Sequence, residues 1–155
     1  QQVSSAASDV YKRQGYSWRL FNHGDLNISE DVQVMYSIAY QDNNLDNNDG
    51  EKWFSVGARP QYAWTDYMST ALEVGYETVE AQNGSGTNDM YKVTVAQMFQ
   101  AGKGVWARPS IRIFATYSES NNEWDRGNEV YGTATGINAE TVDEITFGFN
   151  VETWW

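Results

Sequence analysis

Apolar and polar residues alternate along most of the chain from residue 15 onward, with the period of two that is typical of half-buried β-strands. The pattern predicts seven strands, at residues 16–22, 31–41, 52–64, 68–80, 90–101, 105–118 and 143–155. In the sixth strand the odd positions, from Val105 to Tyr117, are mostly apolar, whereas the even positions are mostly polar. Each strand is therefore expected to have one apolar face and one polar face.

The connections between these strands alternate between short and long. Residues 65–67 and 102–104 are predicted tight turns, whereas residues 42–50, 81–89 and 119–142 are predicted long polar loops. Antiparallel strands of outer-membrane barrels are joined by short turns on one side of the membrane and by long loops on the other. The sequence therefore predicts an all-β fold, an antiparallel meander of about seven strands.

Two prolines interrupt this pattern, because proline has no N–H to donate to a strand ladder. Pro60 and Pro109 both fall inside predicted strands, and both follow an Ala-Arg pair. We expect a bulge or an unpaired amide at each of them, near the end of the sheet that carries the short turns.

Aromatic residues on the apolar face gather at the two ends of the strands. The end with the short turns has Tyr62, Trp64, Phe99 and Trp155, and the other end has Tyr40, Tyr76, Tyr91 and Tyr117. Aliphatic residues and phenylalanines fill the band between them, as in the lipid-facing wall of a membrane barrel. A soluble sandwich also alternates, but it has no reason to sort aromatic residues to both ends.

Composition narrows the possible functional classes of the protein further. The 155 residues contain 10 Lys and Arg against 21 Asp and Glu, a net charge of −11, which argues against nucleic-acid binding. The absence of cysteine excludes disulfide scaffolds and thiolate metal sites. No cofactor or metal site is predicted. Glu73 and Glu77 share a face, but a nucleophile, base and orienting group do not converge, so we expect no enzyme activity.

The first fourteen residues differ from the remainder of the chain. Ser4 to Gln14 match, residue by residue, the translation of a sequencing adapter, and we interpret residues 1–14 as a non-native tail that packs poorly. Residues 15–155 are then the biological part, and any preceding strands and signal peptide are expected to be missing from this sequence.

Three segments, 53–82, 91–119 and 143–155, resemble the C-terminal part of the maltoporin family, the outer-membrane sugar porins. The resemblance runs through nearly all of residues 15–155 and is weakest in 119–142. It implies the C-terminal part of a large transmembrane β-barrel of the porin class, assembled as a homotrimer in the outer membrane of a Gram-negative cell and surrounded by its lipid. It also implies facilitated diffusion of maltose and maltodextrins, with ion transport through the same channel.

The polar face of the predicted strands and the family resemblance together identify candidate sugar-binding residues. Trp106 and Trp154 are large aromatic residues on the polar side of the last two predicted strands, where the family has a lane of aromatic side chains for glucosyl rings. A flat aromatic ring covers the apolar face of a sugar, and neighbouring polar groups take its hydroxyls. A tryptophan that only marks the membrane interface is the alternative. Phe21 and Phe114 are also predicted to point inward.

Trp155 has the opposite parity and is expected to face lipid. Its apolar neighbours at alternating positions resemble the signal that outer-membrane assembly machinery recognises. Three other functions stay open: a general diffusion porin, a soluble β-barrel or sandwich that binds carbohydrate, and an outer-membrane barrel enzyme. We also expect the isolated segment to be unstable as a soluble monomer, because it exposes strand edges and a broad apolar band.

Overall fold

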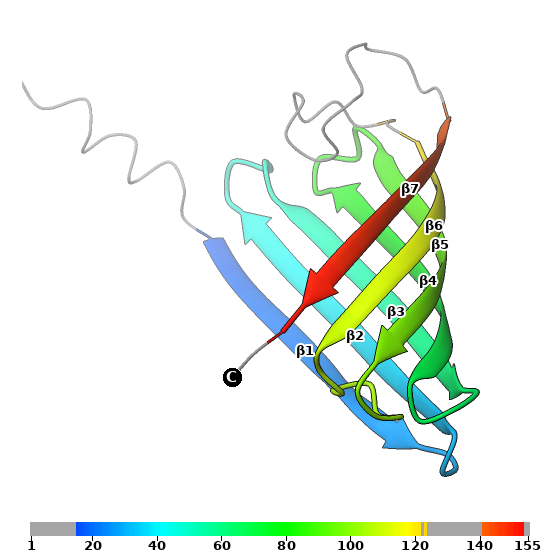
Figure 1. Ribbon diagram of the computed structural model, residues 1–155. Helices are drawn as coiled ribbons and strands as arrows, with labels where there is room; N and C mark the ends of the chain where they lie inside the picture. Colours follow the sequence, from blue (N-terminus) through cyan, green and yellow to red (C-terminus); the bar gives the residue numbers. More distant parts are fainter. Residues whose placement is uncertain (1–14, 122, 124–140, 154–155) are drawn as a thin grey trace, which may run out of the picture.

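The computed structural model describes residues 15–121, 123 and 141–153 (Figure 1). They form seven strands: β1 (Gly15–Asn27), β2 (Val32–Leu45), β3 (Glu51–Ala63), β4 (Met68–Ala81), β5 (Thr87–Gln100), β6 (Ser110–Ser120) and β7 (Val142–Glu152). Among these residues there is no helix long and apolar enough to cross a membrane. The interpretation of residues 1–14 as a tail concerns a segment outside the described residues.

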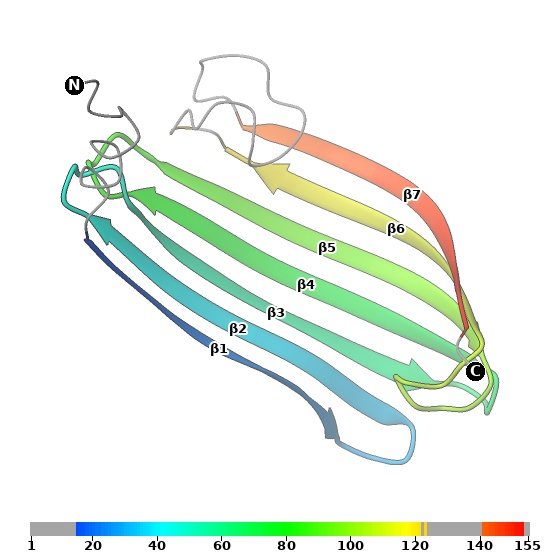
Figure 2. The ribbon, with the colours of Figure 1, turned by 90° about the vertical axis from the view of Figure 1, so that its left-hand side faces the viewer.

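The strands form one antiparallel sheet in chain order, each paired with the next. Figures 1 and 2 show a strongly curved sheet that does not close on itself. In the described part of the chain, β1 and β7 each pair on one side only. The predicted meander of seven strands is thus confirmed, and the sheet has the form of an open section of barrel wall.

Side chains alternate between a polar inner face, on the concave side, and an apolar outer face. The buried strand residues all lie on the inner face: Ala39, Gln61, Ala63, Ser69, Ala71, Val79, Ala81, Asn88, Met98, Gln100 and Ser110. Curvature brings the inner side chains together and spreads the outer ones apart. The exposed apolar residues of the outer face include Ile38, Val56, Leu72, Val74, Val95, Ile113, Phe147 and Phe149.

The two groups of aromatic residues on the outer face also occur where the sequence predicted them. Tyr62 and Trp64, at the short-turn end, meet edge to face with ring centroids 4.6 Å apart. At the other end, Tyr76 and Tyr91 lie 4.8 Å apart on neighbouring strands. Trp155 lies outside the described residues.

The boundary of the sixth strand was predicted wrongly. β6 begins at Ser110 rather than at residue 105, and residues 101–109 form a loop instead of a tight turn at 102–104. Pro109 therefore precedes the strand. Pro60 does lie inside β3, and pairing with β4 is interrupted there, between Ala58 and Gln61, as its missing N–H predicts.

Candidate functional site

Trp106 lies in the loop of residues 101–109, which folds onto the inner face of the sheet. Trp106 is 58% exposed, although the neighbouring Val105 is only 1% exposed. The indole Nε1 points toward the Asp25 carboxylate of β1, with 3.4 Å between Nε1 and Oδ1. The loop thus brings an accessible aromatic ring beside a carboxylate that lies far away in the sequence.

Arg108 ties this loop to the last two strands. Its side chain is 5% exposed and contacts the Glu152 carboxylate of β7 at 2.7 Å. Its Nη1 also donates to the carbonyl oxygens of Val105, at 3.1 Å, and Ala107, at 2.8 Å. Arg112 of β6 reaches the same Glu152 oxygen at 2.7 Å. Charge-assisted hydrogen bonds of this kind are stronger than neutral ones, and here they fix the backbone on both sides of Trp106.

Two adjoining cavities lie on the inner face beyond this loop. One, of about 340 Å³, is lined by Arg59, Glu73, Lys92, Arg112, Phe114 and Asn150 among others. The second, of about 410 Å³, shares Arg59, Glu73 and Lys92 with the first. Lys92 and Glu73 form an ion pair of 2.8 Å and are both partly exposed. Donors and acceptors therefore alternate along a concave surface, which suits a ligand with many hydroxyl groups.

Aromatic rings continue along this inner face. Phe114 lines the smaller cavity and Phe21 the larger one, so their predicted inward direction is confirmed. Phe21 stacks on His23, with ring centroids 5.0 Å apart. His23 falls just beyond the predicted end of the first strand, at residue 22, but it belongs to β1 and faces inward.

Trp53 is an inner-face aromatic residue that was not among the predicted site residues. It pairs with Gln41 of β2 on the inner face, and the Arg19 guanidinium lies 5.8 Å from its ring centroid. Its parity relative to Ser55 could have identified it. The adjacent Phe54 faces outward, however, and two consecutive aromatic residues conceal the alternation.

The other predicted site residues have different outcomes. Trp154 lies outside the described residues, so its position on the polar face stays a prediction. Glu73 forms an ion pair with Lys92. In the part of the chain that the structure describes, no group of three or more His, Asp or Glu side chains could hold a metal ion.

The arrangement combines an exposed tryptophan, a row of charged groups and a curved wall whose apolar side faces outward. In a comparison with known protein families, the family model described as LamB porin matches residues 1–155. Proteins of this family are β-barrel channels for sugars in the outer membrane.

Proposed function

Because this chain belongs to the LamB porin family, we propose that it forms part of a channel through which maltose and maltodextrins diffuse down their gradients. The family is one of channels and not of enzymes. The observation that carries the proposal is a tryptophan, Trp106, that is 58% exposed on the polar inner face and lies beside a carboxylate. Such a ring can bind one apolar face of a glucosyl unit while the charged groups bind its hydroxyl edge.

The sheet is proposed to be one section of a larger barrel wall, with three copies of the complete protein forming a homotrimer in the outer membrane of a Gram-negative cell. Two observations support this. The edges of β1 and β7 are unpaired in the described structure, and a barrel removes such edges by closing. The outer face carries exposed apolar residues between two groups of aromatic residues, and outer-membrane lipid would cover them.

Transport through the proposed channel depends on contacts that are individually weak. A sugar bound tightly at one point would block the pore, whereas several modest sites let it move from one to the next. Trp106 and Trp154 are the proposed sites at the short-turn end of the channel. The ion pair of Lys92 and Glu73 and the side chains of Arg59 and Arg112 are proposed to exchange hydrogen bonds with the sugar further along.

Block of ion current by maltohexaose, measured in reconstituted full-length protein, tests this function. Replacing Trp106 or Trp154 with Ala should weaken block several-fold, since loss of one aromatic contact costs on the order of 1 kcal/mol. Conductance of small ions should change little, because neither ring closes the pore. Trp64→Ala, an equally exposed tryptophan on the outer face, is the matched control and should block like wild type.

Two results would contradict parts of the proposal. Wild-type block in both Trp106→Ala and Trp154→Ala would reject the aromatic lane and favour a general diffusion porin.

Trp155 is proposed to contact lipid and to contribute to recognition by the assembly machinery. Trp155→Ala should therefore lower the amount of assembled trimer and leave sugar block per channel unchanged; altered block at normal assembly would reverse the assigned faces of the last strand.

A further inference from the structure

Three glutamine side chains converge on four consecutive backbone positions just before Trp106. Gln100 Nε2 donates to the carbonyl oxygens of Gly102, at 2.8 Å, and Gly104, at 3.1 Å. Gln61 Nε2 donates to the carbonyl oxygen of Lys103, at 3.1 Å. The N–H of Val105 donates to Gln33 Oε1, at 2.7 Å. These three side chains, Gln33, Gln61 and Gln100, are called the amide bracket here.

The bracket belongs to the sheet rather than to the loop that it holds. Gln33 on β2 and Gln61 on β3 are directly opposite in the register, and Gln100 is the last residue of β5. Gln61 is 2% exposed and Gln100 is 5% exposed. The amide of Gln33 is itself held, because its Nε2 donates to Asn27 Oδ1 on β1. Four strands therefore contribute to fixing the path of residues 102–105.

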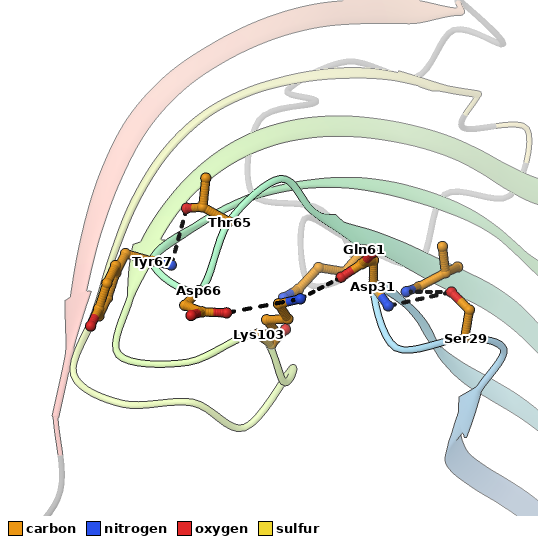
Figure 3. Close-up of polar contacts among 8 residues, drawn as sticks. Ser29, Asp31, Gln61, Thr65, Asp66, Tyr67 and Lys103 are labelled. Carbon is orange, nitrogen blue, oxygen red and sulfur yellow. Dashed lines mark hydrogen bonds and ion pairs between the residues drawn. The ribbon is translucent and has the colours of Figure 1, made fainter.

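Ionic contacts supplement the bracket but are exposed to solvent. Lys103 Nζ lies 2.7 Å from Asp31 and 3.8 Å from Asp66, in turns that follow β1 and β3 (Figure 3). Figure 3 also draws Gln61, whose side-chain amide donates to the backbone carbonyl of Lys103. Exposed ion pairs contribute little and weaken with salt, whereas a buried N–H without an acceptor is costly. The neutral amides are thus the stronger restraint.

The restraint is applied to the backbone on either side of Trp106 and not to its ring. Val105 is held at its N–H by Gln33 and at its carbonyl by Arg108, and the N–H of Ala107 donates to the carbonyl of Gly104 at 2.9 Å. Among the described residues, the polar contact of the ring is the 3.4 Å approach of Nε1 to Asp25. The loop backbone therefore determines the position of the Trp106 ring, and the two faces of the ring stay accessible to a ligand.

We propose that Gln33 is a positioning residue for sugar recognition: through the N–H of Val105 it holds Trp106 at the place where the ring meets a passing glucosyl unit. The inference rests on the proposed function of Trp106 and adds a residue that does not touch sugar. Gln61 and Gln100 act in the same way on Lys103, Gly102 and Gly104. A site that is fixed before its ligand arrives loses less entropy on binding.

Two substitutions of Gln33 distinguish the effect of its hydrogen bond to Val105 from the effect of its side-chain volume. Gln33→Met keeps length and volume but removes the acceptor, so the buried N–H of Val105 has no partner and the loop must move to find one. Gln33→Glu keeps an acceptor at the same place, and the Asn27 amide can rotate to donate to it. Gln97→Met is the matched control, because Gln97 is a glutamine on the outer face, hydrogen-bonded to Thr70 and to the carbonyl of Ser69.

The experiment is maltohexaose block of ion current through the reconstituted full-length channel, with assembly quantified for every variant. Gln33→Met should weaken block several-fold, mainly through faster sugar dissociation, and Gln33→Glu and Gln97→Met should block like wild type. In a channel that already carries Trp106→Ala, adding Gln33→Met should cause no further loss, because the residue being positioned is gone.

The outcomes distinguish this inference from the function on which it rests. Wild-type block in Trp106→Ala rejects the proposed role of Trp106 and, with it, the positioning role of Gln33. Weakened block in Trp106→Ala together with wild-type block in Gln33→Met rejects the positioning role alone. Full additivity of the two changes also rejects it, since Gln33 would then act on sugar by another route. If Gln33→Met does not assemble, Gln61→Met takes its place and must weaken block in the same non-additive manner.

Discussion

The two faces of this sheet reverse the arrangement of a water-soluble protein. On the inner face most buried residues are small or polar, such as Ala71, Ser69 and Gln61, whereas the outer face exposes Phe147 and Phe149 at 78% and 77%. Burial on the inner face follows from curvature and a folded loop rather than from hydrophobicity. Exposure on the outer face has a physical reason only if the surrounding medium is apolar.

This difference indicates that each face is matched to a different solvent. The inner face keeps charged groups together, because water in a channel screens and hydrates them. In the described strands, the outer face has no charged side chain between its two groups of aromatic residues, because a charge inside a bilayer costs several kcal/mol. A charged side chain introduced on the outer face should therefore be costly, whereas one introduced on the inner face should be tolerated.

A lysine placed on each face tests this comparison with the largest expected effect. Phe147 and Thr146 are neighbours in β7, facing outward and inward respectively. Phe147→Lys should lower the free energy of unfolding in lipid by about 2–4 kcal/mol, the cost of a lysine near the midplane of an outer-membrane barrel. Thr146→Lys should change it far less. Equal losses in chemical unfolding titrations of the two proteins in liposomes would contradict the assignment of faces.

An added methyl group tests how closely the inner face is packed. A Cβ on Gly148 would lie 2.5 Å from the ring of Phe114, whereas a Cβ on Gly75 would have its nearest neighbour at 3.9 Å. Gly148→Ala should therefore destabilise the protein by about 1–3 kcal/mol, as overpacking does, and should move a ring that lines the smaller cavity. Gly75→Ala should be close to neutral in the same unfolding measurement. The reverse order would mean that the packing beside Phe114 is loose.

The smallest effect is expected at the exposed ion pair of the short-turn end. The hydrogen bond and negative charge of Asp31 raise the pKa of Lys103 above its ordinary value. A group with a raised pKa stabilises the fold fully below its unfolded pKa, about 10.4 for lysine, and loses that contribution as the pH rises through the folded value.

Lys103→Ala should consequently reduce stability slightly, by the same amount throughout the neutral range, and the difference from wild type should shrink in concentrated salt and in strong alkali. Unfolding titrations across pH and salt would measure it. A loss as large as that of Gly148→Ala, or one that changes near neutrality, would show that this contact is not a simple exposed pair.

Sequence alone was sufficient for most of the fold because its signals are local. The alternation of faces predicted the strands, and Pro60 predicted the break in pairing between β3 and β4. The strands proved longer than expected at several ends, as in β1, which continues to Asn27. Polar residues such as His23 and Asp25 continue the strand on the inner face, where polarity does not indicate a loop.

The start of the sixth strand could not be predicted in this way. Val105, Trp106 and Ala107 continue the alternation of the strand that follows, yet they belong to a loop. That loop depends on Gln33 and Gln61, far away in the sequence, and on Gly102 at a φ of +126°, a conformation that favours glycine. Trp106 was therefore assigned correctly to the inner face but to the wrong element.

The central claim is that the inner face is the wet wall of a sugar channel and the outer face contacts lipid. The chain has no cysteine, so single cysteines can report on each face. Thr94 faces inward, with its hydroxyl 2.7 Å from that of Thr116, and the adjacent Val95 is 50% exposed on the outer face. The decisive measurement is the rate at which a charged, membrane-impermeant thiol reagent modifies Thr94→Cys and Val95→Cys in reconstituted channels. We expect that Thr94→Cys reacts, that maltohexaose slows this reaction, and that Val95→Cys is protected; a reactive Val95→Cys beside an inert Thr94→Cys would contradict the assignment of the two faces.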